Sequence, residues 1–249
     1  SRWPGGVMHH VSKDGFVTPR RDDLPLTVIR NAAGLTLSLL PSGALFAQEH
    51  VEGSRRILIN QTLASPLADG MAGLFLRIAG ASGPAASIIG AQAGLKVGAD
   101  KDRIVWEGET GGIGHKVTLA LHPTLAVWLW RVDIVNRREA AVSCDAALVQ
   151  DLGLGDPGFL MNNEAYACQY MDHHIARHAR LGPVLMSRQA LSQGGVFPWA
   201  AHGCLDGAAG FATDYRQIVG PQGRDGDGLA LLFGQDLPSA RLQFETACA

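Results

Sequence analysis

From Leu26 to Val149, short apolar or alternating runs are separated by glycine, proline, asparagine or aspartate at intervals typical of β-strands. No segment of fifteen or more residues shows a persistent helical stripe, although a doubly wound α/β fold would need several. The pattern therefore predicts an all-β architecture. The expected strands are Leu26–Arg30, Leu35–Leu39, Ala44–Gln48, Arg56–Gln61, Leu74–Ala79, Arg103–Glu107, His115–Leu121, Leu125–Val135 and Ala141–Asp151.

Turn residues predict how the first three strands are connected. Asn31–Gly34 and Pro41–Gly43 have the chemistry of tight turns, so we expect the first three strands to form an antiparallel meander. Val127–Val135 begins apolar throughout and then alternates, which is typical of a central strand covered at one end and half-solvated at the other. Asn136–Glu139 predicts the turn that follows.

Later segments are less regular. Ala165–Ala179 is the best helix candidate because Tyr166, Tyr170 and His174 follow an i, i+4 series, but its tyrosine-rich first half could equally be a strand. Residues 220–228 read as a surface loop, and residues 229–233 as a last strand. No linker divides the chain, so we expect one domain over residues 1–249.

Composition narrows the function classes. Hydrophobic residues make up 47% of the chain and charged residues 18%, which supports a real core and excludes general disorder. The net charge of −2 gives no field to attract a polyanion, so nucleic acid is not an expected partner. The four cysteines are widely spaced and match neither a metal motif nor a dense disulfide framework, so we expect free thiols.

The densest polar cluster is Met161–Arg180, which permits three interpretations. His174 and His178 at i, i+4 on a helix could share a metal with Asp172 or Glu164, but surface histidines are much commoner than ligands, and we expect no metal. Glu164 or Asp172 could instead act as a general base while a histidine acts as a general acid, as sugar mutarotases require. The third interpretation is a hydrogen-bonded seam that fastens an irregular connection to the sandwich.

Aromatic and planar polar groups recur farther along the chain. Ser187–Gln189, Phe197–Trp199 and Thr213–Gln217 combine the side chains that bind sugar hydroxyls and the apolar face of a pyranose ring. Trp199 could stack on a glucosyl unit, or it could fill a core or an interface.

The run Asn163–His174 resembles a segment of cyclic β-1,2-glucan synthases and related phosphorylases of glycoside hydrolase family 94, in which an aromatic-rich strand carries a Gln-Tyr-x-Asp-His element. The resemblance continues through Val184–Gln189, Phe197–Gly203 and Phe211–Gly220. Leu129–Val142 is similar to the family's long strand that ends in asparagine and a charged turn, whereas the first hundred residues resemble the family only in the abundance of strands.

This resemblance implies a two-sheet antiparallel supersandwich like that of galactose mutarotase, with at most one or two short helices. In the family, an α/α toroid follows this domain and holds the catalytic acid, so no catalytic residue and no cofactor are expected here. The implied partners are the toroid of the same polypeptide, a β-glucan or oligosaccharide, and a second copy in a homodimer. The implied location is the cytoplasm or the cytoplasmic face of a membrane enzyme.

Three hypotheses for function follow. The leading one is a non-catalytic domain that packs on the toroid and shapes the active-site rim; the others are a self-contained mutarotase-like epimerase and a free-standing glucan-binding module. The residues expected to face the sugar are Asn163, Gln169, Asp172, His173, Arg188, Gln189, Trp199 and Asp214.

Overall fold

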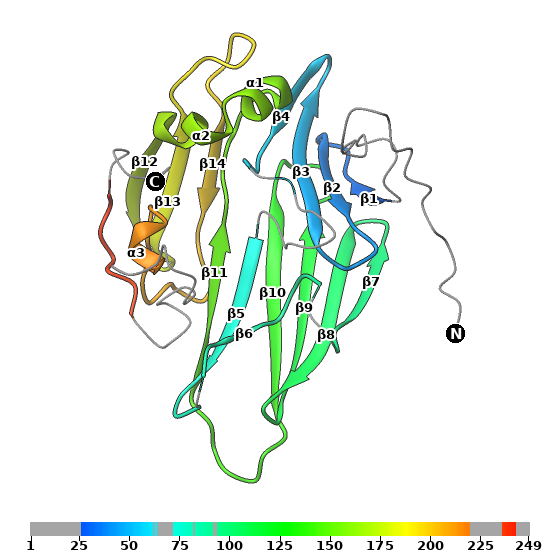
Figure 1. The fold of residues 1–249 in the computed structure, drawn as a ribbon, viewed down its shortest axis with the longest axis vertical. Coiled ribbons are helices and arrows are strands. Elements are labelled where there is room, and N and C mark those ends of the chain that lie inside the picture. Colours follow the sequence, from blue (N-terminus) through cyan, green and yellow to red (C-terminus); the bar gives the residue numbers. More distant parts are fainter. Residues whose placement is uncertain are drawn as a thin grey trace, which may run out of the picture.

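The structure, a computed structural model, describes residues 26–61, 63, 72–81, 83–91, 94–219 and 236–242. Within these residues the chain forms fourteen strands and three α-helices (Figure 1). None of the three helices is longer than six residues. The all-β prediction is therefore confirmed. No helix of this part of the chain is long and apolar enough to cross a membrane. The predicted loop at 220–228 and strand at 229–233 lie outside the described residues.

The strands pair in antiparallel sheets. The first sheet contains β1 (Thr27–Arg30), β2 (Leu35–Leu39), β3 (Leu45–Glu52) and β4 (Arg55–Leu58), and the second contains β7 (Lys96–Asp100), β8 (Arg103–Thr110), β9 (Ile113–Leu121) and β10 (Trp128–Asn136). The third contains β5 (Ala72–Ile78), β6 (Ala86–Ser87) and β11 (Cys144–Gln150), and the fourth β12 (Met171–His178), β13 (Gly182–Gln189) and β14 (Trp199–His202). The helical segments are α1 (Pro157–Asn162), α2 (Glu164–Ala167), the 3-10 turn η2 (Cys168–Tyr170) and α3 (Arg216–Val219). The sandwich thus divides into four hydrogen-bonded sheets where two were expected, with three α-helices where one or two were expected.

The predicted meander of the first strands is confirmed. In the turn before β2, the Asn31 side-chain oxygen accepts hydrogen bonds from the backbone N–H groups of Ala33 and Leu35 at 3.1 and 2.9 Å. Gly34 has a φ of +85°, and a Cβ there would collide with the carbonyl of Val51. Only glycine fits this position without strain.

The prediction that Val127–Val135 is a central strand is wrong, because β10 lies at the edge of its sheet in the order β10-β9-β8-β7. Its apolar residues divide between two faces. Trp128 and Trp130 pack against the core, whereas Leu129 and Val135 are exposed. An apolar run therefore reflected the burial of one strand face and gave no information on the number of neighbouring strands.

The best helix candidate, Ala165–Ala179, is helical only in its first part. The tyrosine-rich half is helical in α2 and η2, while the histidine-rich half is β12. β12 pairs with β13 along its whole length, from Met171↔Gln189 to His178↔Gly182. These long-range backbone hydrogen bonds override the local pattern, which did not predict β12, β13 or β14. The short strands β6 and β7 were missed as well.

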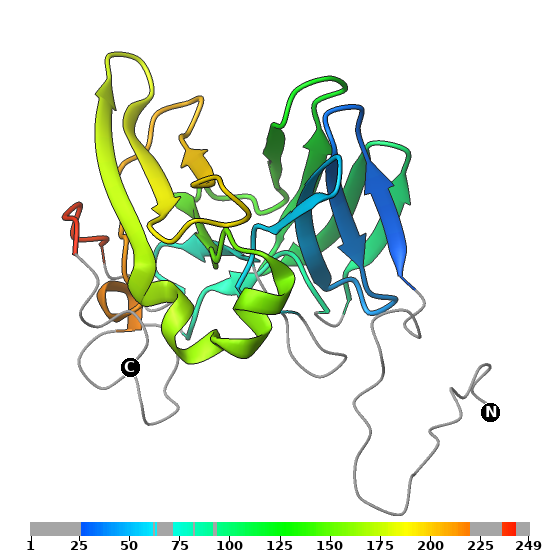
Figure 2. The ribbon, with the colours of Figure 1, turned by 90° about the horizontal axis from the view of Figure 1, so that it is seen from above.

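The largest core cluster forms where the apolar sides of the sheets meet, and it includes Met171 and Ala200 of the fourth sheet. Trp106 of β8 is fully buried, and its Nε1–H donates to the carbonyl of Gly43 at 2.9 Å. Its ring stacks on Trp130 of β10, with centroids 6.0 Å apart. A smaller cluster lies under α1, where Leu160 packs with residues that include Phe46. Figures 1 and 2 place β12–β14 on the opposite side of the molecule from β1.

One cysteine prediction is wrong. Cys168 is disulfide-bonded, whereas Cys144 and Cys204 are free as expected, and Cys248 lies outside the described residues. The spacing of cysteines along the sequence does not report their distance in the fold, and sequence alone could not find this bond.

Removing the Trp106 side chain is expected to destabilise the fold strongly. Trp106→Ala leaves a large cavity and an unpaired Gly43 carbonyl, so urea unfolding should show a loss of about 3–5 kcal/mol. The control Val135→Ala, at an exposed position of β10, should change stability by no more than about 0.5 kcal/mol. A loss below about 1 kcal/mol for Trp106→Ala would contradict the assigned role of this residue.

Candidate functional site

The fourth sheet sorts its side chains onto two faces. Its register aligns Asp172 of β12, Arg188 of β13 and Trp199 of β14 in one row across the three strands. The next row, His173, Ser187 and Ala200, points to the opposite face because side chains alternate along a strand. Ser187 and Ala200 are buried, whereas Trp199 is 57% exposed. We call Asp172, Arg188 and Trp199 the outer row.

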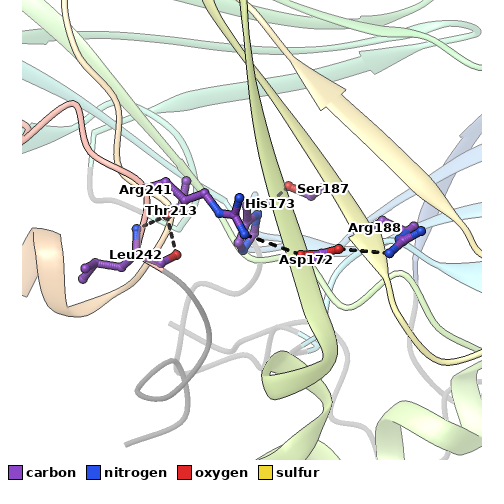
Figure 3. A network of polar contacts seen from close by, with 7 residues as sticks. All are labelled: Asp172, His173, Ser187, Arg188, Thr213, Arg241 and Leu242. Carbon is purple, nitrogen blue, oxygen red and sulfur yellow. Dashed lines mark hydrogen bonds and ion pairs between the residues drawn. The ribbon is translucent and has the colours of Figure 1, made fainter.

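The members of the outer row contact one another. An Nη2–H of Arg188 donates to Oδ2 of Asp172 at 3.0 Å, and the guanidinium lies 5.4 Å from the centre of the Trp199 ring. The second oxygen of Asp172 lies 3.7 Å from Nη2 of Arg241 (Figure 3). Exposed ion pairs contribute only about 0–1 kcal/mol, and exposed cation–π contacts about 0.5–1 kcal/mol. The row is therefore ordered but is a minor source of stability.

Arg241 completes the cluster and was not among the predicted residues. The Thr213 hydroxyl holds its segment in place, since it accepts from the N–H of Leu242 at 3.0 Å and donates to the carbonyl of Leu242 at 3.1 Å (Figure 3). The side-chain amide of Gln217 donates to the carbonyl of Ala240 at 2.7 Å. Since Arg241 lies far from Asp172 in the sequence and in no motif, only the fold reveals this contact.

The opposite face of the sheet contains two half-buried histidines, His173 and His202. Nδ1 of His173 lies 2.9 Å from the hydroxyl of Ser187. Burial lowers the pKa of His173, and the charge of Arg241 lowers it further, although Asp172 and Asp214 oppose the shift. His202 of β14 meets the ring of Trp128 edge-on, with centroids 5.7 Å apart, and burial lowers its pKa as well.

Four other predicted residues lie apart from the outer row. The side-chain amide of the fully buried Gln189 donates to the carbonyl of Gly153 at 3.0 Å, so it anchors β13 from within. The Asn163 amide donates to the carbonyl of Phe159 at 2.8 Å and closes α1. Asp214 is buried at the start of the turn that leads into α3, and Gln169 is exposed in η2. Asn163 and Gln189 therefore have structural contacts that explain their presence.

The metal hypothesis for His174 and His178 is wrong because it required a helix. On β12 they share a face but lie four residues apart, which corresponds to about 13 Å along a strand. A single ion cannot bridge that separation. In the described part of the chain, no three His, Cys, Asp or Glu side chains gather as a metal site would require.

The lowered histidine pKa values predict that stability falls in mild acid. In the unfolded chain these histidines titrate near about 6.5, so below that pH the unfolded state binds more protons than the folded state. The contribution is present above about pH 6.5 and is lost as the pH falls toward the lowered values. Urea midpoints measured from about pH 7.5 down to 5.5 should therefore decrease.

The variant His202→Gln should show a shallower decrease than the wild type, while His174→Gln, at an exposed position of β12, should keep the wild-type slope. Equal slopes in all three proteins would show that His202 is not responsible.

Comparison with known proteins adds two findings. The family model of the SOGP N-terminal domain matches residues 38–249. A 1,2-beta-oligoglucan phosphorylase of Listeria innocua serovar 6a is 28% identical over 216 residues, which are 86% of this chain and 19% of that protein. The chain thus spans about a fifth of the length of this curated relative. The range matched by the family model contains every strand from β3 onward and the whole outer row. The chain belongs to the SOGP N-terminal domain family.

Proposed function

We propose that this chain is a non-catalytic domain of a carbohydrate-active enzyme of the glycoside hydrolase family 94 type, either a β-glucan phosphorylase or a cyclic glucan synthase. The observation that carries the proposal is the uneven coverage of the alignment. It includes most of this chain but only 19% of the phosphorylase, so most of the relative's length has no counterpart here. The parent enzyme's general acid then belongs to the remaining part, an α/α toroid.

In this proposal the domain packs on the toroid, shapes the rim of its active site and supports a homodimer. The segment from Asn163 to Gln217 faces the toroid and its sugar chain. The exposed outer row supports this orientation, because an ordered aromatic, carboxylate and guanidinium that add little to stability are available to a ligand. Single exposed apolar residues need no explanation, whereas an ordered cluster of this kind has chemistry suited to recognition.

A mutarotase-like epimerase is less well supported by the geometry. Such an enzyme needs a histidine and a carboxylate that converge on the same sugar. Asp172 is engaged by Arg188 and Arg241, and the neighbouring His173 points to the opposite face of the sheet. The glucan-binding hypothesis has one specific observation in its favour, which is the exposed indole of Trp199.

The proposed location of the parent enzyme is the cytoplasm or the cytoplasmic face of a membrane. Structural disulfides are rare in the reducing cytosol. The disulfide bond of Cys168 therefore stands against this location.

The purified chain is expected neither to phosphorolyse nor to hydrolyse β-glucans. A preparation free of host enzymes, incubated with β-1,2-glucan and phosphate, should release no glucose 1-phosphate and no reducing sugar, because this proposal assigns the general acid to the toroid. The polypeptide encoded by the complete parent gene, assayed in parallel, is the positive control. Glucose 1-phosphate formed by the chain alone would refute the non-catalytic role.

A further inference from the structure

The geometry points to a sugar site on the outer row: we infer that Trp199 stacks on the apolar face of a β-linked glucosyl residue while Arg188 and Asp172 hydrogen-bond its hydroxyl groups. The choice of glucose as the sugar rests on the proposed function. The site itself rests on the exposure, order and chemistry of the three side chains.

Trp199 has a ring face open to a ligand. The Arg188 guanidinium lies over one face of the ring, and 57% of the residue is nevertheless exposed. The next residue on the same side of β14 is Ala201, which is also exposed and is too small to cover the indole. Phe197, two residues before Trp199, is exposed as well. Aromatic surface is therefore available at this edge of the sheet.

Arg188 and Asp172 provide the polar half of the site. Both are planar groups with several hydrogen-bonding positions. Their ion pair uses one N–H of the guanidinium and one oxygen of the carboxylate, and the other oxygen lies 3.7 Å from Arg241. Since strands are spaced by about 4.8 Å, the row from Asp172 to Trp199 extends over roughly 10 Å. This length suits an exposed sugar unit that contacts the indole and the ion pair together.

The row is held in place before any ligand binds. Gln189, the neighbour of Arg188, is fully buried, and its N–H donates to the carbonyl of Pro198 at 3.1 Å. This bond fixes the backbone just before Trp199. Arg188 itself is held between Asp172 and the indole. A preordered site loses less conformational entropy on binding than a flexible one.

The immediate surroundings of Trp199 favour a sugar over a protein partner. The core of a protein interface is apolar and poor in aspartate, glutamate and lysine, although tryptophan and arginine are enriched there. The indole here instead adjoins a guanidinium that is paired with a carboxylate, and beside them on β12 lies the exposed His174. A neutral sugar can use all of these groups without burying an unpaired charge.

Isothermal titration calorimetry of the chain with a β-1,2-linked glucose tetrasaccharide tests the site. We expect measurable binding, a loss of at least about tenfold in affinity for Trp199→Ala, and a partial loss for Trp199→Phe. Arg188→Ala should weaken binding too. Tyr166→Ala removes an equally exposed aromatic side chain from α2 and should leave the affinity unchanged. Circular dichroism of each variant confirms that it is folded.

Because the sugar is neutral, the affinity should be the same at about 0.05 and 0.5 M salt, whereas binding of inorganic phosphate to the arginines would weaken with salt. The inference is overturned if Trp199→Ala binds the tetrasaccharide as the wild type does, or if the wild-type chain does not bind it. Weakened association of Trp199→Ala with the rest of the parent enzyme, without sugar binding, would assign the row to a protein contact. Turnover by the isolated chain would overturn the proposed function. A chain that neither turns over β-glucan nor binds the tetrasaccharide would overturn the sugar site and leave the proposed function standing.

Discussion

Each sheet of this domain has one apolar face that must be covered, and the burial of Trp106 shows how the first two sheets cover each other. Trp106 of β8 reaches the carbonyl of Gly43, next to β3, and rests on Trp130 of β10. Two residues before Trp130, Trp128 meets His202 at the end of β14. The aromatic contacts of the core therefore continue to the strand that begins with Trp199. The position of the outer row depends on this packing.

The alternation of side chains along β12, β13 and β14 separates the buried side chains that hold the sheet to the domain from the exposed side chains of the outer row. One face contains Ser187, Ala200 and the fully buried Gln189, which connect the sheet to the rest of the domain. The other face displays the outer row, whose contacts are exposed or half-exposed and energetically modest. Neighbouring residues in the sequence, such as Asp172 and His173, thus have different roles. Residues on the exposed face of such a sheet can therefore be changed without loss of the fold.

Much of the fold could be predicted from the sequence, because turn residues and alternation report directly on local structure. The meander of β1–β3 followed from Asn31, Gly34 and Gly43. The edge position of β10 and the strand state of β12 could not be predicted, since they depend on pairing with distant segments. The predicted site residues included the whole outer row, because aromatic and planar polar residues that suit sugar binding cluster in this part of the sequence. Which of its residues meet depends on the register of β12–β14, and Arg241 joins them only through the path of the folded chain.

The side chains of the outer row contribute little to the stability of the domain, whereas the side chains on the buried face of the same sheet stabilise it. The free energy of unfolding in urea, measured for alanine variants of the two faces, tests this difference most directly. Arg188→Ala and Trp199→Ala should each lower stability by no more than about 1 kcal/mol. Gln189→Ala, which leaves the buried Gly153 carbonyl unpaired, should lower it by about 1–3 kcal/mol. Losses for the two outer-row variants that equal or exceed the Gln189→Ala loss would contradict the account.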